Sequence, residues 1–294
     1  MLFRSGVTFA PNEMSSRNRP VGNDGPIRLR TLLSYDGTDF HGWAKQERLR
    51  TVQGVFESAL THLFGIEIET VCAGRTDTGV HARGQVAHFD IPSSIWSDFL
   101  KENDPIRRIN RAIPDDLRLI SIEIAPIGFD ARFSALDRTY TYRFSDGDMG
   151  PTPLDRRTVV RWPHRLDESR MQSAANLFLG EHDFVAFCRK REFTSTIRAI
   201  TRFDWVREAD LLTATVTADA FCHSMVRSIM GAMSAVGEGR REVEWISSLL
   251  TLTTRSGEVP VLPPHGLTLE GVRYPDDSQL EARANETRNF REVQ

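Results

Sequence analysis

Segments with the period of a β-strand and segments with the period of an α-helix alternate along this chain, and many strand segments follow one another through short turns. Residues 27–35 alternate apolar and polar side chains, as a half-buried strand does. Residues 52–64 carry apolar side chains three and four positions apart, which is typical of an amphipathic helix, and Gly65 follows as a C-terminal cap. This mixture favours an α+β fold with mixed, mainly antiparallel sheets flanked by helices.

The second half of the chain resembles the first in plan. Further strand patterns cover residues 67–72, 85–91, 117–125, 138–145, 197–207, 211–218 and 267–274, and further helical patterns cover 104–113, 171–179, 224–236 and 243–250. Two related α/β halves, residues 27–130 and 131–275, are therefore expected to share a central active-site cleft. Residues 1–26 are expected to be a disordered extension and residues 276–294 a mobile charged tail.

Composition excludes several classes of protein. Hydrophobic residues make up 40% of the chain, which suits a filled core, and no run of 18 apolar residues predicts a membrane span. The three cysteines are odd in number and widely spaced, so we expect neither a disulfide framework nor a zinc site, and free thiols suit the cytoplasm. The net charge of −3 does not by itself indicate nucleic acid. Nearly all cations are Arg, which binds phosphate well, although a GC-rich genome would favour Arg too.

The most informative stretch is Ala-Gly-Arg-Thr-Asp-Thr-Gly-Val-His-Ala at residues 73–82, between two expected strands. Its two glycines permit a strained turn and the close approach of a ligand backbone. In an extended segment Arg75 and Asp77 would face the same side, so the sequence predicts that they pair. Such a cation keeps a carboxylate anionic, which suits a nucleophile or a base. A salt bridge that only fixes the turn is the structural alternative.

The stretch closely resembles the signature of the tRNA pseudouridine synthase A family, in which it surrounds the catalytic aspartate. Six other segments resemble family motifs in the family's order, at residues 35–43, 51–54, 130–135, 138–142, 221–227 and 265–269. One departure is Ala44, where the family usually has Gln. That departure puts in doubt any contact made by the family's glutamine.

The resemblance implies an isomerase that converts uridine to pseudouridine at positions 38, 39 and 40 of the tRNA anticodon stem-loop, without a cofactor or metal. It implies Asp77 as the catalytic carboxylate, which would attack C1′ or uracil C6 or remove the C2′ proton. It also implies that Arg75, Tyr140 and Arg227 bind substrate and that the protein is a homodimer. Tyr142 shares the strand face of Tyr140, so the motif alone favours Tyr140.

Such an enzyme must flip its target nucleotide out of the stack, and phosphate contacts would help to offset that cost. Candidate phosphate contacts are Arg83, Arg107, Arg108, Arg111, Arg156, Arg157 and Arg161. The main alternative is a non-catalytic RNA-binding protein, but the aromatic strand motif of an RNA-recognition module is missing. A nucleoside hydrolase and a zinc base deaminase are disfavoured, because neither an acid-rich metal loop nor the Pro-Cys-x-x-Cys pattern is found.

Overall fold

The computed structural model describes residues 25–101, 104–189 and 195–292. The strands are β1 (Pro26–Tyr35), β2 (Val71–Cys72), β3 (His81–Pro92), β4 (Leu117–Ile124), β5 (Asp137–Ser145), β6 (Val160–Arg161), β7 (Gly180–Asp183), β8 (Ile197–Glu208), β9 (Leu211–Ala218) and β10 (Leu267–Arg273). The helices are α1 (Val52–Phe64), α2 (Ser93–Lys101), α3 (Pro105–Ala112), α4 (Glu168–Asn176), α5 (Met225–Gly237), α6 (Trp245–Leu250) and α7 (Leu280–Glu292). Short 3-10 turns are η1 (Val185–Phe187), η2 (Pro264–Gly266) and η3 (Asp277–Gln279).

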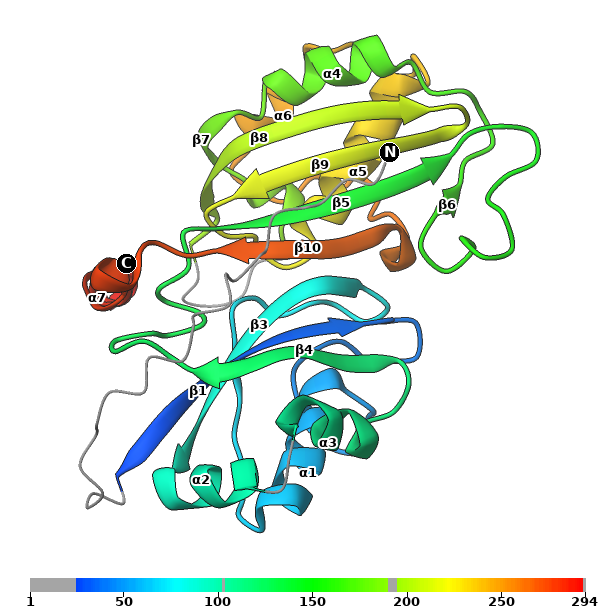
Figure 1. Cartoon of the computed structure of the whole chain (residues 1–294). Coiled ribbons are helices and arrows are strands. Elements are labelled where there is room, and N and C mark those ends of the chain that lie inside the picture. The colour runs from blue at the N-terminus through cyan, green and yellow to red at the C-terminus, as the bar shows by residue number, and fades with distance from the viewer. Residues whose placement is uncertain (1–24, 102–103, 190–194, 293–294) are drawn as a thin grey trace.

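One ten-stranded sheet runs through the described part of the chain, in the order β4-β1-β3-β10-β5-β9-β8-β7, with β2 and β6 paired beside β3 and β5. The β3–β10 and β5–β6 pairs are parallel and the others are antiparallel. In Figure 1, α1, α2 and α3 lie against the lower strands, and α5 and α6 lie behind β8 and β9. The predicted α+β class with mainly antiparallel pairing is confirmed, and the two halves share a single sheet.

The two halves of the sheet meet along a short seam between β3 and β10. Only two residue pairs, Thr268 with His81 and Leu269 with Ala82, are in register there. Gly84 lies just beyond the seam, where a Cβ atom would come within 2.4 Å of the carbonyl oxygen of Glu270. A glycine at this position therefore allows the backbones of the two halves to approach closely.

Local signals set the ends of the helices in the first half. The Thr51 side chain accepts a hydrogen bond from the Gly54 N–H and caps α1, and Gly65 ends the helix in the left-handed conformation (φ 71°). The Asp104 side chain caps α3, which begins with Pro105. Both helices therefore begin and end within one residue of the positions that the sequence predicts.

Three expectations differ from the structure. Only Val71–Cys72 of the expected strand 67–72 pairs with a neighbour, whereas β3 starts earlier than expected, at His81. The helix α2 and the short strands β6 and β7 were not predicted. The charged segment expected as a mobile tail contains a helix, α7, whose Leu280 and Ala284 are buried. Residues 1–24 of the expected extension, which was placed at residues 1–26, lie outside the described residues.

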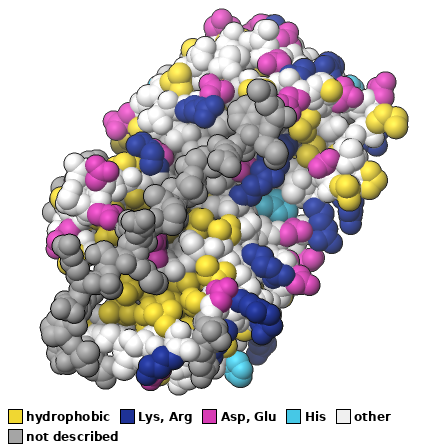
Figure 2. Space-filling view, viewed as in Figure 1, with side chains coloured by type: hydrophobic (Ala, Val, Ile, Leu, Met, Phe, Trp, Pro, Cys, Tyr) yellow, Lys and Arg dark blue, Asp and Glu magenta, His cyan; other side chains and the backbone are white. Residues whose placement is uncertain are grey.

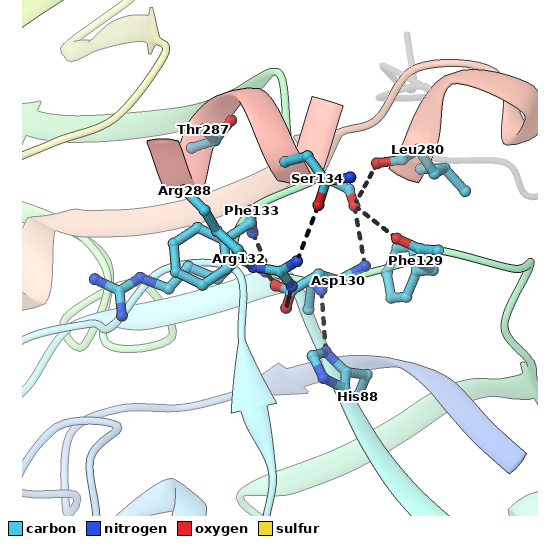
Figure 3. Close-up of polar contacts among 12 residues, drawn as sticks. His88, Phe129, Asp130, Arg132, Phe133, Ser134, Leu280, Thr287 and Arg288 are labelled. Carbon is cyan, nitrogen blue, oxygen red and sulfur yellow. Dashed lines mark hydrogen bonds and ion pairs between the residues drawn. The ribbon is translucent and has the colours of Figure 1, made fainter. Parts of the chain in front are cut away.

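The helix α7 docks on the turn that joins the two halves (Figure 3). Arg288 of α7 donates to the Asp130 carboxylate at 2.9 Å, and the Ser134 hydroxyl donates to the carbonyl of Leu280 at 3.1 Å. The other Asp130 oxygen accepts the backbone N–H groups of Arg132 and Phe133, at 2.9 and 2.8 Å. The C-terminal segment therefore helps to fix the motif turn at residues 130–135.

His88 supports the same turn from β3 (Figure 3). Its Nδ1 atom accepts the Ala131 N–H at 3.0 Å, so this nitrogen must be unprotonated for the contact to form. Burial and the nearby Arg28 guanidinium lower the pKa of His88 to about 4. The folded protein therefore holds His88 neutral at pH values where an unfolded chain would protonate it.

We expect the protein to lose stability as the pH falls from about 6.5 to about 4, because in this window the unfolded chain binds a proton at His88 that the folded chain does not bind. A difference of about 2.5 between the folded and unfolded pKa values corresponds to a loss of at most about 3 kcal/mol in the free energy of unfolding.

In His88→Asn, an amide oxygen can still accept the Ala131 N–H but does not titrate. Urea unfolding at pH 7 and pH 4.5 should show a smaller pH dependence in this variant than in wild type. The exposed His164→Asn should behave as wild type, and parallel pH dependences for His88→Asn and wild type would contradict the assignment.

Candidate active site

Asp77 lies in the connection between β2 and β3, with 26% of its side chain exposed. Its own carbonyl accepts the Val80 N–H at 3.1 Å, which closes a tight turn at residues 77–80. Gly79 in this turn has a φ of 77°, a left-handed conformation that suits glycine. The carboxylate is therefore held on a compact turn and remains open to a ligand.

Buried side chains hold the segment that precedes Asp77. Arg138 of β5 is 7% exposed and donates to the carbonyl of Ala73 at 2.7 Å. Gln85 of β3 donates to the carbonyl of Gly74 at 2.7 Å. The hydroxyl groups of Tyr35 and Thr76 lie 2.8 Å apart and are both buried. Contacts from both halves of the chain thus fix the backbone that carries the carboxylate.

The loop of residues 36–44 packs against the other side of the Asp77 turn. The Trp43 N–H donates to the Thr76 carbonyl at 3.0 Å, and the Gly79 N–H donates to the Phe40 carbonyl at 3.2 Å. Gly42 has a φ of 83°, and a Cβ atom there would lie 2.8 Å from the Thr76 carbonyl oxygen. Ala44, the departure from the family pattern, packs half-buried against the core. This loop is therefore a rigid support for the turn.

Two basic side chains of the second half approach the Asp77 carboxylate. Arg227 Nη1 lies 3.5 Å from Oδ2, and His223 Nε2 lies 3.6 Å from Oδ1. The expected pairing of Arg75 with Asp77 is not found among the ion pairs of the described residues, and Arg75 is exposed. The carboxylate faces Arg227 and His223 of the second half instead.

The start of α5 places both of these groups. Ser224 adopts a left-handed conformation (φ 65°) between His223 and the first turn of the helix, a strained geometry for a residue with a side chain. Arg227 Nε donates to the carbonyl of Leu262 at 2.7 Å, which leaves Nη1 directed at Asp77. The sequence did not single out His223, which lies before the helix in the same motif segment, residues 221–227, as Arg227.

Tyr140 of β5 lies beneath this group of side chains. It is 7% exposed and packs edge-on against Phe221, with ring centroids 5.1 Å apart. Burial raises its pKa strongly, and the nearby Tyr35 and Asp77 add to the shift, so the hydroxyl keeps its proton. Tyr142, which shares the strand face, donates to the Pro263 carbonyl at 2.8 Å and contributes to the core instead.

The cysteines differ from the sequence expectation. Cys188 and Cys222 form a disulfide, with Cα atoms 5.8 Å apart, a separation within the usual range. Cys72 is free and buried. A separation of 34 residues hid this pair from sequence analysis, because only the fold brings η1 beside the start of α5.

A basic hollow of about 920 Å³ lies between α1, α3 and the loop at residues 45–51. The basic side chains in its lining are Lys45, Arg50, His62, Arg108 and Arg111, and its lining includes no acid among the described residues. Acids just outside the lining pair with two of these cations, Arg50 with Asp116 at 2.8 Å and Lys45 with Glu57 at 3.4 Å. Figure 2 shows Lys and Arg side chains over α3 with acidic ones beside them.

The remaining candidate phosphate contacts are scattered over the surface. Arg83 pairs with Glu270 at 3.1 Å, and Arg157 pairs with Asp36 at 3.1 Å. Arg107, Arg156 and Arg161 are exposed. Within the described ranges, no three His, Cys, Asp or Glu side chains gather as a metal site would require. In the same ranges, no helix is long and apolar enough to span a membrane.

Comparison with known proteins finds similar sequences over most of the chain. A family model described as tRNA pseudouridine synthase matches residues 32–123 and 174–275. The chain is 49% identical over 271 residues to tRNA pseudouridine synthase A of Streptomyces griseus, covering 91% of this chain and 95% of that protein. It is 48% identical to the protein of that name from Mycobacterium leprae (93% and 98% covered) and 49% identical to that from Frankia casuarinae (91% and 97% covered).

Proposed function

Since the chain belongs to the tRNA pseudouridine synthase family, and is thus an isomerase that converts uridine to pseudouridine, we propose that it acts on positions 38, 39 and 40 of the tRNA anticodon stem-loop, with Asp77 as its catalytic group. One observation carries the proposal: the family's aspartate is an accessible carboxylate flanked by a guanidinium and an imidazole. The first half of the chain, residues 27–130, supplies Asp77, and the second half, residues 131–275, supplies Tyr140 and Arg227.

The reaction breaks the N-glycosidic bond and joins uracil C5 to ribose C1′. Positive charge develops on the sugar as the bond breaks, so a carboxylate close to C1′ lowers the barrier. Attack on C1′ or C6 and removal of the C2′ proton all begin with Asp77 as an anion, and the Arg227 guanidinium lies 3.5 Å from one of its oxygens. Because no electrons are gained or lost and no group leaves, we propose that the reaction needs neither a cofactor nor a metal.

The substrate contacts that we propose follow from where each side chain lies. Tyr140, buried beside Asp77, forms the floor on which the flipped uracil stacks. Arg75, exposed two residues before Asp77, contacts the backbone of the displaced nucleotide rather than orienting the carboxylate. Arg227 orients Asp77 and balances the negative charge of its carboxylate beside the sugar.

We propose that the basic hollow beside α1 and α3 contacts tRNA phosphates. Its loop at residues 45–51 is joined to the catalytic region, because the His41 N–H donates to the Arg50 carbonyl at 2.8 Å and the Val52 N–H donates to the Gly42 carbonyl at 3.1 Å. Phosphate contacts there would offset the cost of about a few kcal/mol for unstacking the target base. A cytoplasmic homodimer, in which the partner chain completes the cleft, is part of the same proposal.

Purified protein should release tritium to solvent from unmodified tRNA labelled at uracil C5, without added metal or nucleotide, because the C5 hydrogen is lost in the reaction. A matched tRNA with cytidine at positions 38, 39 and 40 should release none. Release from both tRNAs would overturn the proposed positions but not the reaction. If the protein folds and binds tRNA but releases no tritium from either, the non-catalytic RNA-binding alternative would replace the proposal.

A further inference from the structure

We propose that Arg138 is a positioning residue that sets the loop carrying Asp77 against the start of α5, an inference that rests on the proposed function of the Asp77 site. Asp77 and Arg227 come from different halves of the chain, so their separation of 3.5 Å depends on how the halves are joined. The seam between β3 and β10 joins them through two residue pairs. A further connection close to Asp77 would therefore fix the position of the carboxylate.

The guanidinium of Arg138 makes such a connection, because it binds backbone carbonyls of three different segments. Its Nη1 atom donates to the Asp219 carbonyl at 2.6 Å, and Nη2 donates to the carbonyls of Ala73 and Arg132 at 2.7 and 2.9 Å. The Ala73 carbonyl belongs to the loop of the catalytic carboxylate, and the Asp219 carbonyl follows β9 on the way to α5. One side chain thus links the segments that carry the facing groups of the site.

The Arg132 carbonyl ties this link to a firmly held part of the fold. The motif turn to which it belongs is held by the Asp130 carboxylate, by His88 and by the docked helix α7. A single guanidinium nitrogen donates to both Arg132 and Ala73, so the two carbonyl groups must lie close together. The position of the catalytic loop therefore follows from the position of the motif turn.

The burial of Arg138 favours a positioning role over a purely stabilising one. The side chain is 7% exposed, and burial lowers its pKa, which means that its surroundings disfavour the charge. None of the ion pairs of the described residues includes it, so carbonyl groups surround the charge. A buried cation is costly, and an apolar side chain of similar volume is often at least as stabilising. The planar fork of arginine, in contrast, suits three carbonyls in separate directions.

The test measures single-turnover pseudouridine formation at saturating tRNA and, separately, tRNA binding. Arg138→Met keeps the length of the side chain but removes its donors. We expect the reaction to slow by about 10²-fold, the effect of a displacement of about 1 Å in an active site. Binding of tRNA should stay close to that of wild type, because the buried side chain does not meet the RNA. Arg138→Lys keeps the charge without the fork, so its rate should lie between the two.

Arg207→Met is the matched control for the loss of a supporting arginine. Arg207 also donates to a carbonyl, that of Leu166 at 2.7 Å, and it pairs with Asp146 at 2.8 Å. Neither partner belongs to the three segments that Arg138 links. This control should lower the free energy of unfolding but leave the folded protein with the wild-type rate of pseudouridine formation.

A double-mutant cycle with Arg227→Met separates positioning from general stability. If Arg138 acts by holding Asp77 against Arg227, the Arg227 substitution should slow the reaction less in Arg138→Met than in wild type. Strictly additive effects on the rate, or a wild-type rate in folded Arg138→Met, would overturn the inference. If Arg138→Met does not fold, Arg138→Lys takes its place in the cycle. Failure of the proposed function is distinguishable, because wild type itself would then form no pseudouridine.

Discussion

Replacing Asp77 with Asn should abolish pseudouridine formation, with a fall of at least about 10⁴-fold, the scale observed when a group that acts in the chemical step is removed. The substitution preserves the shape of the side chain but removes its charge and its nucleophilic oxygen. The structure gives no reason for the variant to unfold, because the turn is held by backbone contacts and by Arg138, Gln85 and Tyr35. The measurement is tritium release from C5-labelled tRNA.

Binding should separate from catalysis in the same variant. A carboxylate repels phosphate, so Asp77→Asn should bind unmodified tRNA at least as tightly as wild type does. Asp39→Asn offers a matched control, because Asp39 is an exposed acid on the neighbouring loop. That control should retain activity within about twofold, as expected for a surface substitution.

Equal tritium release by wild type and Asp77→Asn would remove Asp77 from the mechanism even if the reaction class survived. The two remaining polar groups, Arg227 and His223, would then have to act without the carboxylate that they face. A weaker loss, of about tenfold, would indicate that Asp77 only assists electrostatically. The size of the effect therefore distinguishes a reacting group from a supporting one.

The sequence predicts those elements whose ends carry their own signals. The helix α1 runs from Val52 to Phe64 as expected, because Thr51 and Gly65 mark its two ends. The strand β9 matches the prediction because its apolar and polar residues alternate throughout. The helix α7 is anchored by Leu280 and Ala284, too few apolar positions to give a helical pattern.

The site shows a similar division between local and long-range information. The motif locates Asp77, but the partners of Asp77 come from a segment about 150 residues away, so no local rule identifies them. The expected contact between Arg75 and Asp77 is not found among the ion pairs of the described residues, and the carboxylate faces Arg227 and His223 instead. The seam at Gly84 could not be predicted from local patterns either, because it depends on which strands become neighbours in the sheet.

Replacing Arg227 with Met should lower the rate of the chemical step by about 10²- to 10³-fold, the usual cost of removing one preorganised donor from an active site. Arg227 lies 3.5 Å from Asp77 Oδ2 and donates through Nε to Leu262, so it links the carboxylate to the core of the second half. Arg227→Lys keeps the charge but cannot make both contacts, since lysine lacks the planar fork of arginine. It should therefore show an intermediate rate in single-turnover assays.

The pair of variants separates the electrostatic role of Arg227 from its structural one. If Arg227 only anchors the start of α5, Met and Lys should both reduce the free energy of unfolding, by about 1 kcal/mol for the lost hydrogen bond, and leave the chemical step unchanged. If its charge stabilises Asp77 as an anion, Lys should recover part of the rate that Met loses, while tRNA binding stays similar in both. The exposed Arg255→Met controls for the loss of one positive charge in tRNA binding and should react at the wild-type rate. A wild-type rate in Arg227→Met would remove Arg227 from the chemical step.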